Sequence, residues 1–417
     1  MTSNTEQQQH DTFAAIKIPE FKYLLLSRFA FTMGLRMMST LVGWWIYELT
    51  NLPFAIGIVG LSEFLPAFSF ALYAGHVIDS SEKKWMLQRG MLLYFVCASM
   101  LLLLSTHFTA GHLTHHQMAL CIYGIIFCTG TIRAFTGPVF NVILASIVPK
   151  KALQNATTWN TGSYLLAAVC GHATGGFLIY SFGVTGTLTT IACFIIIAFI
   201  FISQLSKKMP LNIRGEKRTL ESVKEGLRFV FKTKELLGAI SLDLFAVLFG
   251  GAVAMVPVYA RDILHVDARG FGWLNGASDM GSILMVIWLT MFPPHKKQGY
   301  KLFFAVAGFG LCIIIFGLSS LYALSFLALM ASGMLDGFSV VIRGTITQLK
   351  TPDNMRGRVI SVNSMFINSS NELGQFESGV AAKLLGVVPS VVFGGCMTLL
   401  VVVTTWFKAP SLRKMEY

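Results

Sequence analysis

The sequence predicts an all-α, polytopic membrane protein with twelve transmembrane helices in two six-helix bundles. Hydrophobic residues make up 54% of the 417 residues and charged residues only 12%, about half the charged share of an ordinary soluble protein, ~25%. Apolar runs of about 20 residues, the length that spans a bilayer, recur along the chain. Lipid offers a bare backbone no hydrogen-bond partners, so these runs are expected to be helices. A soluble enzyme, a nucleic-acid-binding protein and a disordered scaffold are excluded.

Twelve segments are long and apolar enough to be spans, some of them with polar interruptions. They lie at 22–49, 54–78, 84–107, 117–140, 157–181, 184–204, 236–260, 268–292, 301–318, 322–346, 359–384 and 388–407. The longest basic connection follows the sixth span and divides the chain into two halves. The predicted organisation is a polar N-terminus (1–20), a first bundle (21–204), a linker (205–235), a second bundle (236–407) and a tail (408–417).

Charge in the connections predicts the orientation. Every second connection is rich in Lys and Arg, as at Lys83–Lys84 and Lys207–Lys208, and the alternate ones are nearly bare. Basic loops face the cytoplasm, so both termini are expected inside. The net charge of +12 has the same origin and does not indicate nucleic acid. The first dozen residues are polar and do not have the pattern of a signal peptide.

The linker and the two halves carry further patterns. Between Leu220 and Phe231, apolar residues at helical spacing predict an amphipathic helix on the inner membrane surface, with a docking site for a partner as the alternative. Pro149 and Asn160 are spaced like Pro352 and Asn363, and each segment follows a helix with a late arginine. Such echoes at half the chain length indicate a duplicated six-helix unit.

Three motifs resemble those of the major facilitator superfamily. The loop after the second span, Gly75-His-Val-Ile-Asp79-Ser-Ser-Glu-Lys83-Lys84, resembles the family's Gly-x-x-x-Asp-Arg loop, with serine where the arginine stands. Arg133-Ala-Phe-Thr-Gly resembles its intramembrane arginine motif. Gly171-His172-Ala-Thr-Gly175-Gly176 resembles its antiporter motif, with His172 at the proline position. The resemblance implies a cytoplasmic lock at Gly75, Asp79, Lys83 and Lys84, and close helix packing at Gly171, Gly175 and Gly176.

Longer stretches are similar to one bacterial branch of the superfamily, that of enterobactin exporters and transmembrane secretion effectors. They are Trp44–Ala67, Ser241–Leu264 and Thr351–Gly379, and the similarity extends over roughly residues 20–408. The resemblance implies a facilitator fold, a location in a bacterial inner membrane, and export of siderophores or other amphipathic compounds. Because one fold hosts many substrates, it leaves the cargo open.

Charged residues inside the predicted spans are candidates for proton coupling, because a charge in the bilayer core is costly and usually functional. The candidates are Arg36, Glu63, Arg133, His172, Asp336 and Glu372. Arg36 and Glu63 lie at matching depths in consecutive spans, so we expect them to form a pair, and the internal echo places Asp279 at the equivalent of Glu63. For each candidate the alternative is a fixed structural contact. For Asp243, Arg343 and Glu377 that structural role is favoured.

Other chemistry is not indicated. The sequence has no phosphate-binding loop, zinc-protease motif or nucleophile elbow, so neither an enzyme nor an ATP-driven pump is predicted, and no cofactor is expected. The seven cysteines lie in apolar runs without metal-ligand spacing. His112, His115 and His116 fit a solvated loop better than a metal site.

The predicted function is therefore gradient-driven transport, with export of a small molecule coupled to protons. The alternatives are siderophore uptake, multidrug efflux and a non-transporting sensor on the same fold. The expected partners are the lipid bilayer, protons and a small-molecule substrate, and the protein is expected to be a monomer.

Overall fold

The computed structural model describes residues 13, 15–106, 109, 111–149, 152–207, 219–292, 296–352 and 355–416. Nearly all of them are helical. The first half consists of α1 (Pro19–Thr50), α2 (Pro53–Ser80), α3 (Lys83–Leu104), α5 (His115–Thr136), α6 (Val139–Ile147) and α7 (Leu153–Ser203). The linker contains α8 (Thr219–Lys232). The second half consists of α9 (Lys234–Phe249), η2 (Ala252–Met255), α10 (Val256–Val258), η3 (Tyr259–Ile263), α11 (Ala268–Met291), α12 (Gln298–Leu318), α13 (Tyr322–Lys350), α14 (Arg356–Leu385), α15 (Val387–Lys408) and α16 (Pro410–Arg413).

The prediction of an all-helical membrane protein is confirmed. Within the described part of the chain, eight helical stretches are long and apolar enough to cross a membrane. α1, α11 and α14 have comparable lengths but are more polar. The count of twelve crossings stays a prediction.

Short sequence signals place the turns between the helices. α1 and α2 both begin at a proline, whose missing N–H is not needed in the first helical turn. Thr114 and Gln117 form a capping box at the start of α5. Within α7, Gly183 has φ +65°, a conformation that strongly favours glycine, and it separates two antiparallel passes. The predicted spans 157–181 and 184–204 correspond to these two passes.

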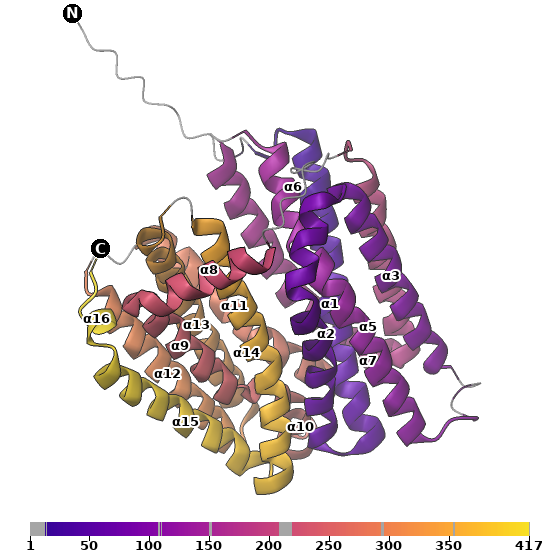
Figure 1. The fold of residues 1–417 in the computed structure, drawn as a ribbon. Helices are drawn as coiled ribbons and strands as arrows, with labels where there is room; N and C mark the ends of the chain where they lie inside the picture. The colour runs from indigo at the N-terminus through magenta and orange to yellow at the C-terminus, as the bar shows by residue number, and fades with distance from the viewer. Residues whose placement is uncertain are drawn as a thin grey trace, which may run out of the picture.

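The helices run between two ends of the molecule. One end, here called the basic end, holds the start of α1, the end of α15 and side chains such as Lys84 and Lys297. The opposite end holds the short turns at Asn51, Gly183 and Gly386. α8 lies across the basic end of the second half, where the Arg358 guanidinium donates to Glu225 at 2.5 Å (Figure 1).

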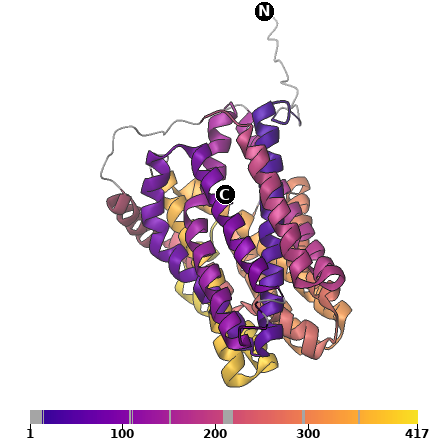
Figure 2. The same ribbon diagram turned by 90° about the vertical axis from the view of Figure 1, so that its right-hand side faces the viewer.

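The two halves stand side by side in Figure 1, and in Figure 2, which is turned by 90°, the first half lies in front of the second. Two helix pairs join them, α2 with α14 and α7 with α11. These are related pairs, because α2 and α11 occupy corresponding places in the two repeats. The interface therefore has the pseudo-symmetry expected of a duplicated six-helix unit.

Candidate functional site

Three charged side chains meet where α2, α5 and α14 come together. The Arg133 guanidinium on α5 donates to Glu63 Oε1 on α2 at 2.5 Å. The same Nη1 atom lies 2.7 Å from Glu372 Oε1 on α14. Glu63 and Arg133 belong to the first half and Glu372 to the second, so we call this group the bridging cluster. It contains two carboxylates and one guanidinium, and its formal charge is negative when all three are ionised.

The burial of the bridging cluster is uneven. The Arg133 and Glu63 side chains are 38% and 31% exposed, whereas the Glu372 side chain is 4% exposed. Glu372 Oε1 is buried, and its ion-pair partner among the described residues is Arg133 Nη1 at 2.7 Å. Glu372 is therefore the member of the cluster that depends most on the two halves staying together.

Small residues bring these three helices close enough for the charges to meet. A Cβ on Gly130 would lie 2.5 Å from the backbone oxygen of Glu63, so only glycine lets α5 approach α2 here. Arg133 follows three residues later on the same face of α5. A Cβ on Gly60 would likewise lie 3.0 Å from the backbone oxygen of Glu372.

The expected pairing of Glu63 with Arg36 is wrong. Arg36 donates from Nη2 to the Tyr164 hydroxyl at 2.8 Å, and Glu63 is joined to Arg133. Matching depth along two helices does not make a pair, because the direction in which a side chain faces depends on which helices are neighbours. α2 packs on α5 and α14, whereas α1 packs chiefly on α7.

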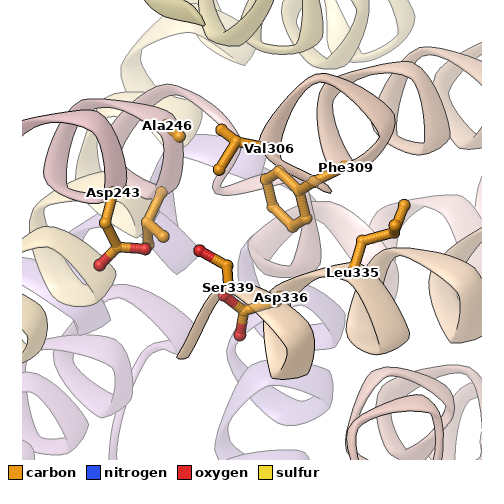
Figure 3. Close-up of a pocket in the computed structure, with 8 residues that line it drawn as sticks. Asp243, Ala246, Val306, Phe309, Leu335, Asp336 and Ser339 are labelled. Carbon is orange, nitrogen blue, oxygen red and sulfur yellow. The ribbon is translucent and has the colours of Figure 1, made fainter. Parts of the chain in front are cut away.

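A second group of charges lies entirely within the second half. The Arg343 guanidinium on α13 is paired with Asp243 on α9. It also lies 3.8 Å from Asp336 Oδ1, which is on α13 itself, about two helical turns earlier. We call these three residues the internal cluster. The Arg343 and Asp243 side chains are only 7% and 6% exposed. Asp243, Asp336 and Ser339 also line a cavity of ≈ 10 Å³, which is about the space of one water molecule (Figure 3).

His172 connects the two halves at a different place. Its Nδ1 atom lies 2.7 Å from Thr40 Oγ1 on α1, and its Nε2 atom lies 3.5 Å from Asp279 Oδ2 on α11. The residue that replaces the family proline thus contacts a carboxylate of the other half. Asp279, the predicted counterpart of Glu63, in this way also faces the interface between the halves.

The three glycines of the antiporter-like motif pack against two different helices. Cβ atoms on Gly171 and Gly175 would lie 2.7 Å from Arg36 Cβ and 3.2 Å from Met37 Cα, both on α1. A Cβ on Gly176 would lie 2.3 Å from the backbone oxygen of Ala268, at the start of α11 in the other half. Close helix packing at this motif is therefore present both within the first half and between the halves.

Further contacts between the halves lie between the bridging cluster and the opposite end of the molecule. The Tyr47 hydroxyl on α1 donates to Asp262 on η3, and the rings of Trp44 and Phe271 lie 5.2 Å apart. A Cβ on Gly57 would lie 3.0 Å from Gly379 Cα. The structure is thus a state in which the opposite end is closed.

The residues of the predicted lock are only partly described. The surroundings of Gly75 and the side chain of Asp79 are not among those described. Lys84 donates to the backbone oxygens of Ser203 and Leu205 at 2.9 and 2.5 Å, and Lys83 donates to that of Ser81 at 3.0 Å. These bonds are to helix ends and turns of the first half. The locking role stays a prediction, because it concerns a state closed at the basic end.

Sequence reasoning did not identify a polar group on α1, α6 and α7. Arg28 donates to Asn141 at 2.9 Å and to Asn160 at 3.0 Å, and it stacks over Tyr164. A signal was available, because Arg28 and Arg36 are the two arginines of one predicted span. The described residues contain no group of three or more side chains that could hold a metal ion. His112, His115 and His116 therefore do not form such a group there.

Comparisons with known proteins agree with this architecture. A family model described as transmembrane secretion effector matches residues 10–417. The MFS-type transporter YkuC of Bacillus subtilis (strain 168) is 24% identical over 279 residues, 60% of this chain and 61% of YkuC. The enterobactin exporter EntS of Escherichia coli O1:K1 / APEC is 23% identical over 214 residues, 51% of each chain. The matches thus span only about half to three fifths of the length of these curated relatives.

Solved structures show the same fold at low sequence identity. A POT family transporter in complex with 5-aminolevulinic acid has a TM-score of 0.74 and 11% identity, over 94% of this chain and 96% of the other. A mutant of the nucleoside transporter NupG has a TM-score of 0.72 and 13% identity, over 93% and 99%. A bacterial homologue of the lysosomal transporter Spinster, in an inward-facing and unoccupied conformation, has a TM-score of 0.65 and 14% identity, over 94% and 96%.

Proposed function

The chain belongs to the transmembrane secretion effector family of major facilitator transporters, and from that premise we propose that it is a proton-coupled exporter of a siderophore or another amphipathic small molecule. We place it in a bacterial inner membrane with the basic end in the cytoplasm. The structure would then be the state that is closed to the outside. Its two halves would rock about their interface and open alternately to each side.

The observation that carries this proposal is the bridging cluster. Glu372 reaches Arg133 only while α14 lies against α2, so opening the outside would part the two residues. A carboxylate left in the membrane core without its counter-ion is costly, and taking up a proton removes that cost. Closing the outside again would restore the ion pair and release the proton inward. Proton entry and cargo exit are thereby linked through one conformational equilibrium.

The other candidates take secondary places in this scheme. Glu63 competes with Glu372 for the same guanidinium, so it sets how strongly Arg133 holds the second half. His172 and Asp279 form a second contact between the halves that protonation could modify. Asp336 lies in the internal cluster, whose members stay within one half, and we assign it a weaker role in coupling.

The test is gradient-driven flux in proteoliposomes, with enterobactin as one probe and ethidium as the other. The wild type should move at least one probe outward against its gradient when an inward proton gradient is imposed. Glu372→Gln should still exchange the probe down its gradient but lose accumulation. Glu377→Gln, which changes the same chemistry on the same helix, is the matched control and should keep it.

Each alternative has its own result in the same assay. Uptake would appear as accumulation in the reverse direction under the same gradient. Multidrug efflux would appear as proton-driven flux of ethidium without enterobactin. A sensor would give no flux of either probe from well-folded protein, and that result would refute the proposal.

A further inference from the structure

The apolar face of the linker helix α8 packs on the second half of the protein. Val230 is 1% exposed and belongs to the same buried cluster as Leu236 of α9 and Val359 of α14. A Cβ on Gly226 would lie 3.1 Å from the backbone oxygen of Arg358, so glycine lets α8 lie close to the start of α14. The protein itself therefore holds α8 in place by the apolar side of the helix.

The opposite face of α8 is cationic. Lys224, Arg228 and Lys232 recur every four residues, so they lie on one side of the helix. All three are exposed, and none of them has a carboxylate of the described residues within 4.0 Å. Glu225, at the edge of this face, is joined to Arg358 of α14 by an ion pair of 2.5 Å. The three cations therefore keep their charge free for a partner outside the chain.

An aromatic side chain stands among these cations. Phe231 follows Arg228 by three residues, so it shares the same side of the helix, and it is 60% exposed. The stems of Lys and Arg are apolar as well, so the phenylalanine and the stems together form an apolar surface with charged groups around it. We call Lys224, Arg228, Phe231 and Lys232 the outer face of α8.

α8 lies at the level where the long helices of the second half begin. It directly precedes the first turn of α9, and its ion pair with Arg358 joins it to the start of α14. Figure 1 shows α8 crossing the helices at the basic end, and Figure 2 shows it at the left-hand edge, outside the bundle. At the same end the rings of Tyr300 and Trp406 lie 5.4 Å apart, and aromatic rings are enriched at membrane–water interfaces. This is the level at which lipid headgroups surround a membrane-spanning chain.

We propose that the outer face of α8 binds the headgroups of anionic phospholipids, such as phosphatidylglycerol, in the leaflet at the basic end. Cations without acidic partners attract lipid phosphate groups, and the linker, residues 205–235, has more than twice as many Lys and Arg as Glu residues. Phe231 and the apolar stems of the cations fit the region just below the phosphates. An acidic protein partner would be a different occupant, and it is one outcome of the test.

The test measures lipid binding by the purified full chain and needs neither cargo nor a gradient. Native mass spectrometry in detergent compares phosphatidylglycerol with phosphatidylcholine, and the wild type should bind phosphatidylglycerol more tightly. Lys224→Gln, Arg228→Gln and Lys232→Gln should each weaken the apparent affinity for phosphatidylglycerol about fivefold. Lys296→Gln is the matched control, because it removes an exposed cation from the turn before α12 at the same end. It should leave the affinity unchanged.

A measurement on the wild type covers the case in which a variant does not fold. A phosphatidylglycerol with a diazirine in its headgroup is photo-activated in nanodiscs, and peptide mass spectrometry locates the adduct. Adducts should form within residues 224–232 and decrease with unlabelled phosphatidylglycerol, but not with phosphatidylcholine. Absence of adducts on α8, or an equal loss of affinity in Lys296→Gln and the α8 variants, would overturn the proposal.

A third arm distinguishes a lipid surface from an acidic protein partner. A polyglutamate peptide is added to the protein in phosphatidylcholine nanodiscs, and hydrogen–deuterium exchange is followed at residues 224–232. We expect less protection by the peptide than by phosphatidylglycerol in the nanodisc. Protection by the peptide together with equal binding of the two lipids would make α8 a protein-docking helix and refute the assignment to lipid.

Discussion

The bridging cluster and the internal cluster are built from the same parts and placed differently. Each has an arginine late in a corresponding helix, α5 or α13, with two carboxylates near it. In the internal cluster all three residues belong to one half, and Arg343 and Asp243 are almost fully buried. In the bridging cluster one carboxylate comes from the other half. The same duplicated charge thus stays within one half in one repeat and joins the two halves in the other.

The largest effect is expected from a change that separates Glu372 from Arg133 and leaves the internal cluster in place. Gly176→Leu should do this, because a side chain there meets the backbone of Ala268 and Gly272 in the other half. We expect loss of all flux with normal membrane insertion. Cross-linking between a cysteine on α2 and a cysteine on α14, both placed at the opposite end of the molecule, should decrease. Gly162→Leu is the control on the same helix, because a Cβ there meets nothing within 4 Å. Normal flux from Gly176→Leu would count against the importance of this contact.

The next largest effect is expected in the internal cluster. Arg343→Gln leaves Asp243 buried without its counter-ion, which should cost about 3–5 kcal/mol of stability. Thermal unfolding in detergent measures this loss, and the double variant Arg343→Gln/Asp243→Asn should recover most of it. Arg133→Gln also leaves the buried Glu372 without its counter-ion, but it should cost less, because the side chains of Arg133 and Glu63 are about a third exposed. Equal losses at the two arginines would contradict the distinction between the clusters.

Glu63→Gln should have an intermediate effect and sharpens the roles within the bridging cluster. It leaves Arg133 and Glu372 as a pair of equal and opposite charges, so the closed outside should become more stable. We expect slower flux, by about tenfold, that is still coupled to protons. If Glu63→Gln uncouples while Glu372→Gln does not, the proton is carried by Glu63 and our assignment is wrong.

The smallest effect is expected at His172. The Nε2 atom lies 3.5 Å from Asp279, which is a long contact, so His172→Gln should change the conformational equilibrium by only about 0.5–1 kcal/mol. Flux should remain within a few-fold of the wild type, with a changed pH profile if the histidine is protonated during the cycle. An unchanged pH profile would leave it a packing residue.

The membrane architecture could be predicted because apolar length and composition are local properties. The break at Gly183 fell between two predicted spans, and the arginines of the two repeats were identified as counterparts. The pairing of the charges could not be predicted in the same way. It depends on the angle at which each helix faces its neighbours, and this is determined by close approaches such as that of Gly130 to Glu63. Reading Gly130 and Arg133 as one helix face would have placed the arginine beside α2.

Arg28 was missed for a related reason. A charge near one end of a predicted span is usually assigned to the water interface, where long side chains reach out of the membrane. The structure instead directs Arg28 toward Asn160 and Tyr164 on α7. Only the packing of α1 on α7 brings these groups together.

The central claim, that Glu372 leaves Arg133 when the outside opens, is tested most directly by a distance measurement. Spin labels at Leu52, just before α2, and at Leu384, near the end of α14, report the separation of the halves, because both residues lie at the opposite end of the molecule and are 58% and 75% exposed. They are placed in a background without the native cysteines, and a pair at Leu321 and Leu384 within the second half is the control. The distance between 52 and 384 should increase as the pH is lowered. In Glu372→Gln the distances should be shifted toward the long value and should not respond to pH, with the control pair constant. A wild-type distance that does not respond to pH, and is equal in Glu372→Gln, would contradict the account.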